Sequence, residues 1–305
     1  MSANSITKTK SLQSQKRAGL IASYIFLIVL SIIWVIPIVW VVFTSFRVEP
    51  GSFVATFFPA PYKWQAEDGR WLEQTYTLQN YIDLFTPNGS YDFGLWYRNT
   101  LIVAVFSCVI STFFAVSTAY VMSRMRFKLR KTFMNVALVL GMFPGFMSMI
   151  AVYFILKSVE MNQTLLALII VYSAGSGLGF YVCKGFFDTV PKALDEAAMI
   201  DGATKAQVFF KIVLPMSKPI IVYQALTAFM GPWMDFIFAK YLMGTNYQTY
   251  TVAIGLYDML SRERIYDYFR QFAAGSVLVA VPIMILFMCL QKYYVEGVTG
   301  GAVKG

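Results

Sequence analysis

The stretch 195–219, DEAAMIDGATKAQVFFKIVLPMSKP, is a charged interval between two long apolar runs. Its pattern predicts two short helices. Pro191, just ahead of the stretch, can occupy the first turn of the first helix. Gly202 is expected to interrupt that helix, because glycine is a weak helix former and accepts tight turns. The interval is therefore expected to form two helices joined by a turn at Gly202.

The second helix of this interval has clear start and stop signals. Thr204 followed by Gln207 has the spacing of a capping box, in which each side chain satisfies a backbone N–H at the helix start. Leu214-Pro215 is expected to end the helix, because proline cannot supply the next helical N–H. The predicted apolar side consists of Val208, Phe209 and Ile212.

The rest of the chain is too hydrophobic for a soluble domain. Hydrophobic residues make up 58% of its 305 residues, against about half in soluble domains, and the mean hydropathy is +0.59. Six runs have the roughly 20 apolar residues that cross a bilayer as a helix, the form that satisfies backbone polar groups in hydrocarbon. The fold class predicted is therefore an all-α membrane protein. The expected spans are Leu20–Phe46, Asn99–Ser123, Phe133–Leu156, Thr164–Phe187, Ile220–Met243 and Gln271–Tyr294.

Lysine and arginine residues set the expected orientation, because cytoplasmic loops carry the excess of them. They gather before the first span, after the second span, and around the 195–219 interval. These three places lie on one side of six spans, so both termini and the two-helix loop are expected in the cytoplasm. The first run is too long for a signal-peptide core and lacks a small-residue cleavage site, so it is expected to remain as a span.

This topology divides the chain into three expected parts. A cytoplasmic tail covers 1–17, a six-span region covers 18–295, and a second cytoplasmic tail covers 296–305. The six-span region would contain an external segment 47–96, the cytoplasmic loop 188–219 and an external loop 244–270.

Several function classes are disfavoured by composition. The net charge of +9 comes from residues that flank the spans, which differs from the single basic face of a nucleic-acid-binding protein. There is no histidine, and no Cys or carboxylate cluster has metal-ligand spacing. No G-x-x-x-x-G-K-[ST] loop is present. We expect no metal site, no catalytic residue and no ATP bound by this chain, so any ATPase must be another subunit.

Three of the expected spans contain helix-weakening residues near their centres, which are tolerated where a neighbour or a water-lined cavity satisfies the backbone. Aromatic rings and one carboxylate near these points are candidates for a substrate path. They are Phe143, Tyr172, Phe229, Trp233 and Asp235. For the aromatic residues, packing is the more common role. For Asp235, a structural role and a substrate contact are equally compatible with the sequence.

The charged interval also carries a motif. Glu196-Ala197-Ala198, three residues, Gly202, nine residues, Ile212, one residue and Leu214-Pro215 resembles, at every defining position, the EAA loop of permease subunits of ABC importers. In that family the loop docks on the ATPase subunit. The resemblance implies that the docking residues here are Glu196, Ala197, Ala198, Gly202, Leu214 and Pro215.

Two further features resemble the carbohydrate branch of that family, the segment GPWMDF at 231–236 and the tail GGAVKG at 300–305. Together they look like the second, shorter permease of maltose-type importers, which carry maltodextrins and other oligosaccharides. The resemblance implies a homologous second permease, two ATPase subunits that bind ATP and Mg, and an extracytoplasmic sugar-binding protein. It also implies that loop 244–270 reaches toward the binding protein and that the tail 300–305 extends between the ATPase subunits. The expected location is the plasma membrane of a prokaryote, in contact with lipid.

Two other functions remain open. The chain could be an ABC permease for a solute other than sugar. It could also be a stand-alone secondary transporter, although few charges lie within its spans and it has no evident internal repeat. A membrane enzyme is disfavoured further, because no nucleophile–base or metal constellation is visible.

Overall fold

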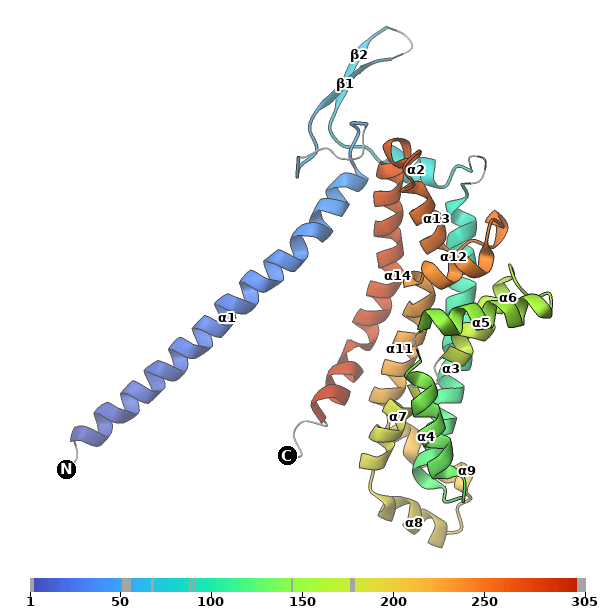
Figure 1. Ribbon diagram of the computed structural model, residues 1–305. Coiled ribbons are helices and arrows are strands. Elements are labelled where there is room, and N and C mark those ends of the chain that lie inside the picture. The colour runs from blue at the N-terminus through green and yellow to red at the C-terminus, as the bar shows by residue number, and fades with distance from the viewer. Residues whose placement is uncertain are drawn as a thin grey trace. The chain divides into compact units, whose positions relative to one another are not determined.

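The computed structural model describes residues 3–50, 56–66, 69–87, 89, 91–143, 145–175 and 179–300, with side chains described between 16 and 293. Most of these residues form helices (Figure 1). The chain separates into two compact units. One comprises Met1–Ile82 with Ile265–Val277, and the other comprises Asp83–Arg264 with Leu278–Gly305.

The first unit contains α1 (Ala3–Ser45), a hairpin of β1 (Tyr62–Gln65) and β2 (Trp71–Gln74), most of α2 (Gln79–Leu84) and the start of α14 (Ile265–Gly300). The end of α1 is held by hydrogen bonds from the side-chain amide group of Asn80. Asn80 Nδ2 donates to the carbonyl oxygens of Ser45 at 3.0 Å and Arg47 at 2.9 Å. This contact fixes the short helix α2 against the point where α1 ends.

The hairpin corrects the prediction of a purely helical fold. Its strands pair antiparallel, with Tyr62 opposite Gln74 and Gln65 opposite Trp71. Tyr62 and Trp64 share one face of the hairpin, and their rings stack at 6.1 Å. Aromatic residues at alternate positions suit a pleated strand, and Gly69 with φ +82° provides the left-handed position in the turn. The expectation of a largely helical fold is confirmed, and the all-helical one is wrong at this hairpin.

The second unit is built around α3 (Phe93–Arg124). Against it pack α6 (Leu165–Ala174), α7 (Gly179–Thr189), α11 (Lys218–Met234) and α13 (Val252–Met259) (Figure 1). Small side chains allow these close approaches, since Ala104 and Ala119 on α3 are fully buried. A buried cluster joins α3, α7 and the charged interval. Its members are Val116, Ala119, Tyr120, Met122, Phe180, Cys183, Phe187, Val208, Phe209 and Val213.

Two of the expected spans are sharply bent or divided. The third consists of α4 (Arg130–Gly141) and α5 (Gly145–Ser158), which meet at 100°. The fifth consists of α11 and α12 (Ile237–Met243), and α11 leaves the preceding segment Lys205–Met216 at 82°. By length and composition, four helical stretches in the described part of the chain could cross a membrane, or up to six if each bent pair forms one span. The six expected spans overlap these helices, with the fifth continuing into α12, and their number stays a prediction.

At the end of α3 near Phe93, the chain from 244 to 259 folds back onto the helix. Asn99 Nδ2 donates to the carbonyl oxygens of Gln248 at 2.9 Å and Tyr250 at 3.0 Å. Thr100 Oγ1 accepts from the Val252 N–H at 2.8 Å. The first half of the expected external loop 244–270 is therefore firmly attached to α3.

Candidate functional site

The charged interval forms the expected pair of helices at the end of α3 that carries Arg124. The first, α8, runs over Lys192–Ile200, with Pro191 as its N-cap, one position ahead of the expected place in the first turn. Gly202 has φ +88°, a left-handed value that favours glycine, and this confirms the predicted turn. The second helix, α9 (Lys205–Val208), starts with both bonds of the predicted capping box between Thr204 and Gln207.

The second helix ends at Met216, one residue beyond the predicted Leu214-Pro215, and the chain then turns by 82° into α11. A π-helical segment, η2 (Phe209–Val213), follows α9, and α10 (Leu214–Met216) follows in turn. The N–H of Leu214 bonds to the carbonyl of Phe209, as a wider π turn requires. Pro215 then occupies the start of α10, where a missing N–H costs little. Within this π-helical segment Val213 is buried, and Ile212, expected on the apolar side, is only half-buried.

The six residues implied as docking residues fall into two groups. Glu196, Ala197, Gly202 and Pro215 are exposed. Ala198 and Leu214 are half-buried and pack against the same buried cluster. The structure thus joins the two halves of the motif through one core and leaves the other four residues open to a partner. Their docking role stays a prediction.

The same loop exposes large apolar side chains that sequence reasoning missed. Ile200 is 86% exposed and Phe210 is 61% exposed. Leu194, Met199 and Met216 are also exposed. Exposed apolar patches often mark interaction sites. The sequence did contain a signal for this patch. Each short helix has more apolar residues than its inward-facing side can hold, so the remaining ones must be exposed.

Polar contacts fix the loop to the last turns of α3. Tyr120 Oη donates to the Lys205 carbonyl at 2.9 Å, and Ser123 Oγ donates to Asp188 Oδ1 at 2.6 Å. Arg124 Nη2 donates to the Val190 carbonyl at 2.8 Å. Arg124 Nε also lies 3.0 Å from Asp195 Oδ2 in an ion pair whose side chains are 5% and 11% exposed. The loop therefore has four polar attachments to one helix end.

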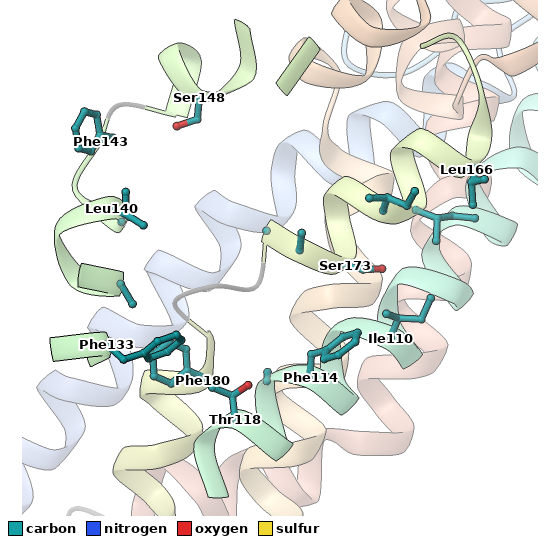
Figure 2. A pocket seen from close by; sticks show the side chains of 17 residues that line it. Ile110, Phe114, Thr118, Phe133, Leu140, Phe143, Ser148, Leu166, Ser173 and Phe180 are labelled. Carbon is teal, nitrogen blue, oxygen red and sulfur yellow. The ribbon is translucent and has the colours of Figure 1, made fainter. Parts of the chain in front are cut away.

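The substrate-path candidates do not converge on one place. Phe143 lines a cavity of about 950 Å³ formed by α3, α4, α5, α6 and α7 (Figure 2). Four aromatic rings line it: Phe114, Phe133, Phe143 and Phe180. Three hydroxyls are contributed by Thr118, Ser148 and Ser173. Of the five candidates, only Phe143 is among the described residues that line this cavity.

The remaining candidates support the break between α11 and α12. Asp235 Oδ2 accepts from Tyr172 Oη at 2.9 Å, and Asp235 Oδ1 accepts from the Phe238 N–H at 3.1 Å. Trp233 is 3% exposed and packs edge-on against Tyr97. Both carboxylate oxygens of Asp235 therefore have hydrogen-bond partners within the chain, and a substrate contact by these residues stays a prediction.

Phe229 and Lys240 also lie near the break between α11 and α12. Phe229 packs on Trp233 with ring centroids 6.0 Å apart. Lys240, the nearest basic residue along the chain, bonds to Tyr250 Oη. Asp235 and Lys240 thus have separate partners, Tyr172 for the carboxylate and Tyr250 for the ammonium group.

Parts of the expected tail and of two expected spans lie outside the described residues. The tail 300–305 lies outside the described residues apart from the backbone of Gly300, and so do Pro144 and residues 176–178 within two of the expected spans. In the described ranges, no group of three or more His, Cys, Asp or Glu side chains could hold a metal ion.

Comparison with known proteins identifies the class. Residues 111–300 match the family described as "Binding-protein-dependent transport system inner membrane component". The chain belongs to this family, so the resemblance drawn from the EAA motif is confirmed. The expected location is confirmed as well: the chain is a multi-pass inner-membrane component of a bacterial ABC transporter, with several apolar helices.

The relatives are permease proteins of about the same length. The galactooligosaccharides transport system permease protein GanQ of Bacillus subtilis (strain 168) is 33% identical over 94% of this chain and 96% of its own. The maltodextrin transport system permease protein MdxG of the same organism is 34% identical over 93% of this chain and 96% of its own. The maltodextrin transport system permease protein MalD of Streptococcus pneumoniae (strain ATCC BAA-255 / R6) is 32% identical over 97% of this chain and 99% of its own.

Solved structures show the same fold. A chain of a bacterial ABC transporter involved in the import of the acidic polysaccharide alginate aligns with a TM-score of 0.71 and 19% identity, covering 92% of this chain and 98% of that one. A bacterial alginate ABC transporter in complex with an alginate pentasaccharide-bound periplasmic protein aligns with a TM-score of 0.60 and 17% identity, covering 90% and 93%.

Proposed function

We propose that this chain is the permease subunit of an ATP-driven importer of neutral oligosaccharides, with six spans and both termini in the cytoplasm. The observation that carries the proposal is similarity over nearly the whole chain to permeases named for maltodextrins and galactooligosaccharides. A maltodextrin-like cargo agrees with the maltose-type features of the sequence, and the galactooligosaccharide relative makes galactosides the second candidate. A homologous second permease would supply the other half of the path.

We propose the loop 188–219 as the coupling element. Glu196 is exposed on α8 and can make a charge-assisted contact. Ile200 and Phe210 are available to fill apolar depressions on a partner. Two ATPase subunits that bind ATP and Mg would dock here. Closure of the ATPase pair would then move the loop as a rigid body and switch the spans between two arrangements.

The cavity lined by Phe143 is proposed as this chain's part of the sugar path. Aromatic faces and hydroxyl groups suit a pyranose ring, which has apolar faces and a polar edge, and both kinds of group line the cavity. Tyr172, Phe229, Trp233 and Asp235 are assigned to support the neighbouring helix break. An extracytoplasmic binding protein would deliver the sugar on the side of loop 244–270.

The first experiment is co-purification of the tagged chain from its native membrane, followed by an ATPase assay with the binding protein and a panel of sugars. Maltodextrins and galactooligosaccharides form the main arms, and amino acids and phosphate test a non-sugar cargo. Recovery of a second permease and an ATPase, with hydrolysis stimulated by one sugar class, supports the proposal. A chain that purifies alone and transports without ATP contradicts it.

The coupling assignment has its own test. Glu196→Lys is expected to insert normally and to abolish ATPase-subunit recovery or uptake, because a cation replaces the exposed carboxylate at the proposed interface. Glu73→Lys is the matched control, since Glu73 is an exposed acid on the hairpin whose pairing with Lys63 is open to solvent and contributes little. Full uptake by Glu196→Lys would remove the coupling assignment.

A further inference from the structure

Two adjacent acids in the loop 188–219, named the coupling loop from here on, have opposite surroundings. Asp195 is 7% exposed, and its Oδ2 lies 3.0 Å from Arg124 Nε. Glu196, the next residue, is exposed. Neighbouring residues on a helix point about 100° apart, since one turn holds 3.6 residues. The α8 helix therefore directs one carboxylate inward to α3 and the other outward to solvent.

The inward contact belongs to a larger attachment at one face of α3. Tyr120, Ser123 and Arg124 are spaced i, i+3 and i+4, so they lie on the same side of the helix. Each reaches a different part of the chain: the start of α9, the end of α7, and α8 together with Val190 ahead of it. The end of α3 thus contacts α7, α8 and α9, which lead into or form the coupling loop.

We propose that Arg124 and Asp195 form a strut that makes the coupling loop and α3 move as one body. In this arrangement Asp195 is a positioning residue that faces the membrane helix, and Glu196 faces the ATPase subunit. The proposal rests on the proposed coupling function of the loop, and it names the connection by which movement of the loop would reach the membrane region.

The path beyond the strut is a single helix. α3 runs without a break from Phe93 to Arg124, and Ile110, Phe114 and Thr118 on it line the 950 Å³ cavity. A rigid element with a fixed attachment can carry a displacement from one site to another. A rotation or shift of α8 transmitted through Arg124 would therefore change the wall of the cavity directly.

Arginine suits this task better than lysine. Its planar group presents several donors in a fixed arrangement, and here Nη2 donates to the Val190 carbonyl while Nε lies 3.0 Å from Asp195 Oδ2 as an ion pair without hydrogen-bond geometry. One guanidinium group therefore contacts both α8 and the chain segment that leads into it. Both side chains are nearly buried, so salt screens this pair much less than an exposed one.

The main test uses Asp195→Asn in the reconstituted full complex, with uptake and ATP hydrolysis measured together. The variant keeps the shape of the side chain and removes its charge. We expect ATP hydrolysis to continue and the uptake per ATP to fall about tenfold, within the range typical of coupling between sites. Asp201→Asn is the matched control, because Asp201 is an exposed acid at the end of the same helix. An unchanged ratio in Asp195→Asn would overturn the strut.

A double-mutant cycle separates a strut from two independent roles. If Arg124 and Asp195 act as one unit, Arg124→Met with Asp195→Asn loses no more coupling than either single variant. Losses that multiply would show that each residue acts separately and would contradict the proposal. Arg124→Lys keeps the charge but can hold only one of the two contacts, so we expect its uptake per ATP to lie between those of wild type and Arg124→Met.

A second readout does not depend on ATPase docking or on the sugar. Lys192, Lys205 and Lys211 are exposed on the loop and are trypsin sites. In inside-out vesicles of the chain, Asp195→Asn should be cut faster than wild type and Asp201→Asn should not. Equal cutting of all three would contradict the strut. If the wild-type complex shows no sugar-dependent ATPase activity while this difference remains, the proposed function fails and the attachment stands.

Discussion

The two ends of α3 hold their neighbouring segments by different means. At the coupling-loop end, the charged side chain of Arg124 pairs with Asp195. At the opposite end, Asn99 and Thr100 hold the 248–252 segment through neutral hydrogen bonds. Close packing adds to the second attachment, because a Cβ on Gly255 would lie 2.0 Å from Trp96 Cε3.

The difference teaches how each attachment responds to change. A nearly buried ion pair contributes little net stability while both partners are present, because desolvation offsets their attraction, but removing one partner leaves an uncompensated charge. Neutral hydrogen bonds each contribute about 1 kcal/mol, so they form a stable but less sensitive anchor. The charged end is therefore suited to transmit a disturbance, and the neutral end is suited to hold a fixed frame.

The largest expected effect is at the charged end. Arg124→Met should lower the free energy of unfolding by roughly 3–5 kcal/mol, because Asp195 is left nearly buried without its partner. A denaturant titration in detergent micelles measures the loss. Combining Arg124→Met with Asp195→Leu should recover much of it, since neither charge remains. A loss as large in the double variant would show that packing, and not the unpaired charge, is responsible.

At the opposite end, the tightest contact is between Gly255 and Trp96. Gly255→Ala should destabilise the protein by about 3 kcal/mol, at the upper end of overpacking costs, because Trp96 is 1% exposed and its ring atoms lie 2.0 to 2.4 Å from the place of the new Cβ. Gly185→Ala is the control, since a Cβ there meets nothing within 4 Å and alanine favours a helix. The same titration compares them, and equal stability of the two variants would mean that Trp96 is free to shift.

The hydrogen bonds of this end should have a smaller effect. Asn99→Leu removes both donors and leaves two carbonyl oxygens without partners, with an expected loss of about 2 kcal/mol. Gln248→Ala is the control, because only the backbone carbonyl of Gln248 takes part. If Gln248→Ala destabilises the protein as strongly, the segment is held by side-chain packing and the neutral anchor is misassigned.

The contrast between the ends also marks what the sequence could predict. The long apolar runs and the EAA spacing are local patterns, so the helices of the expected spans, the turn at Gly202 and the capping box followed from them. The attachment residues were not predictable, because Asn99 and Asp195 contact partners far along the chain or on another helix. No short-range pattern marks such contacts.

The same reasoning explains the corrections. The π-helical segment ahead of Pro215 was not predicted, because its buried residues pack against α3 and α7 and no local pattern indicates that packing. Asp235 carried no signal for its partner, because Tyr172 lies 63 positions away in the chain. The hairpin Tyr62–Gln74 was missed because an aromatic external segment can be strand or loop until its pairing is known.

The smallest effect tests whether the coupling loop stabilises itself. Thr204→Ala removes the side-chain oxygen that accepts from the Gln207 N–H and should cost about 1 kcal/mol, measured as a shift in the denaturant midpoint. Gln207→Ala removes the reciprocal bond to the Thr204 N–H and should cost a similar amount, because both bonds of the box are exposed. If Thr204→Ala costs as much as Arg124→Met, the local cap holds the loop as firmly as α3 does. The distinction between a charged, transmitting end and a neutral, fixed end of α3 would then have to be abandoned.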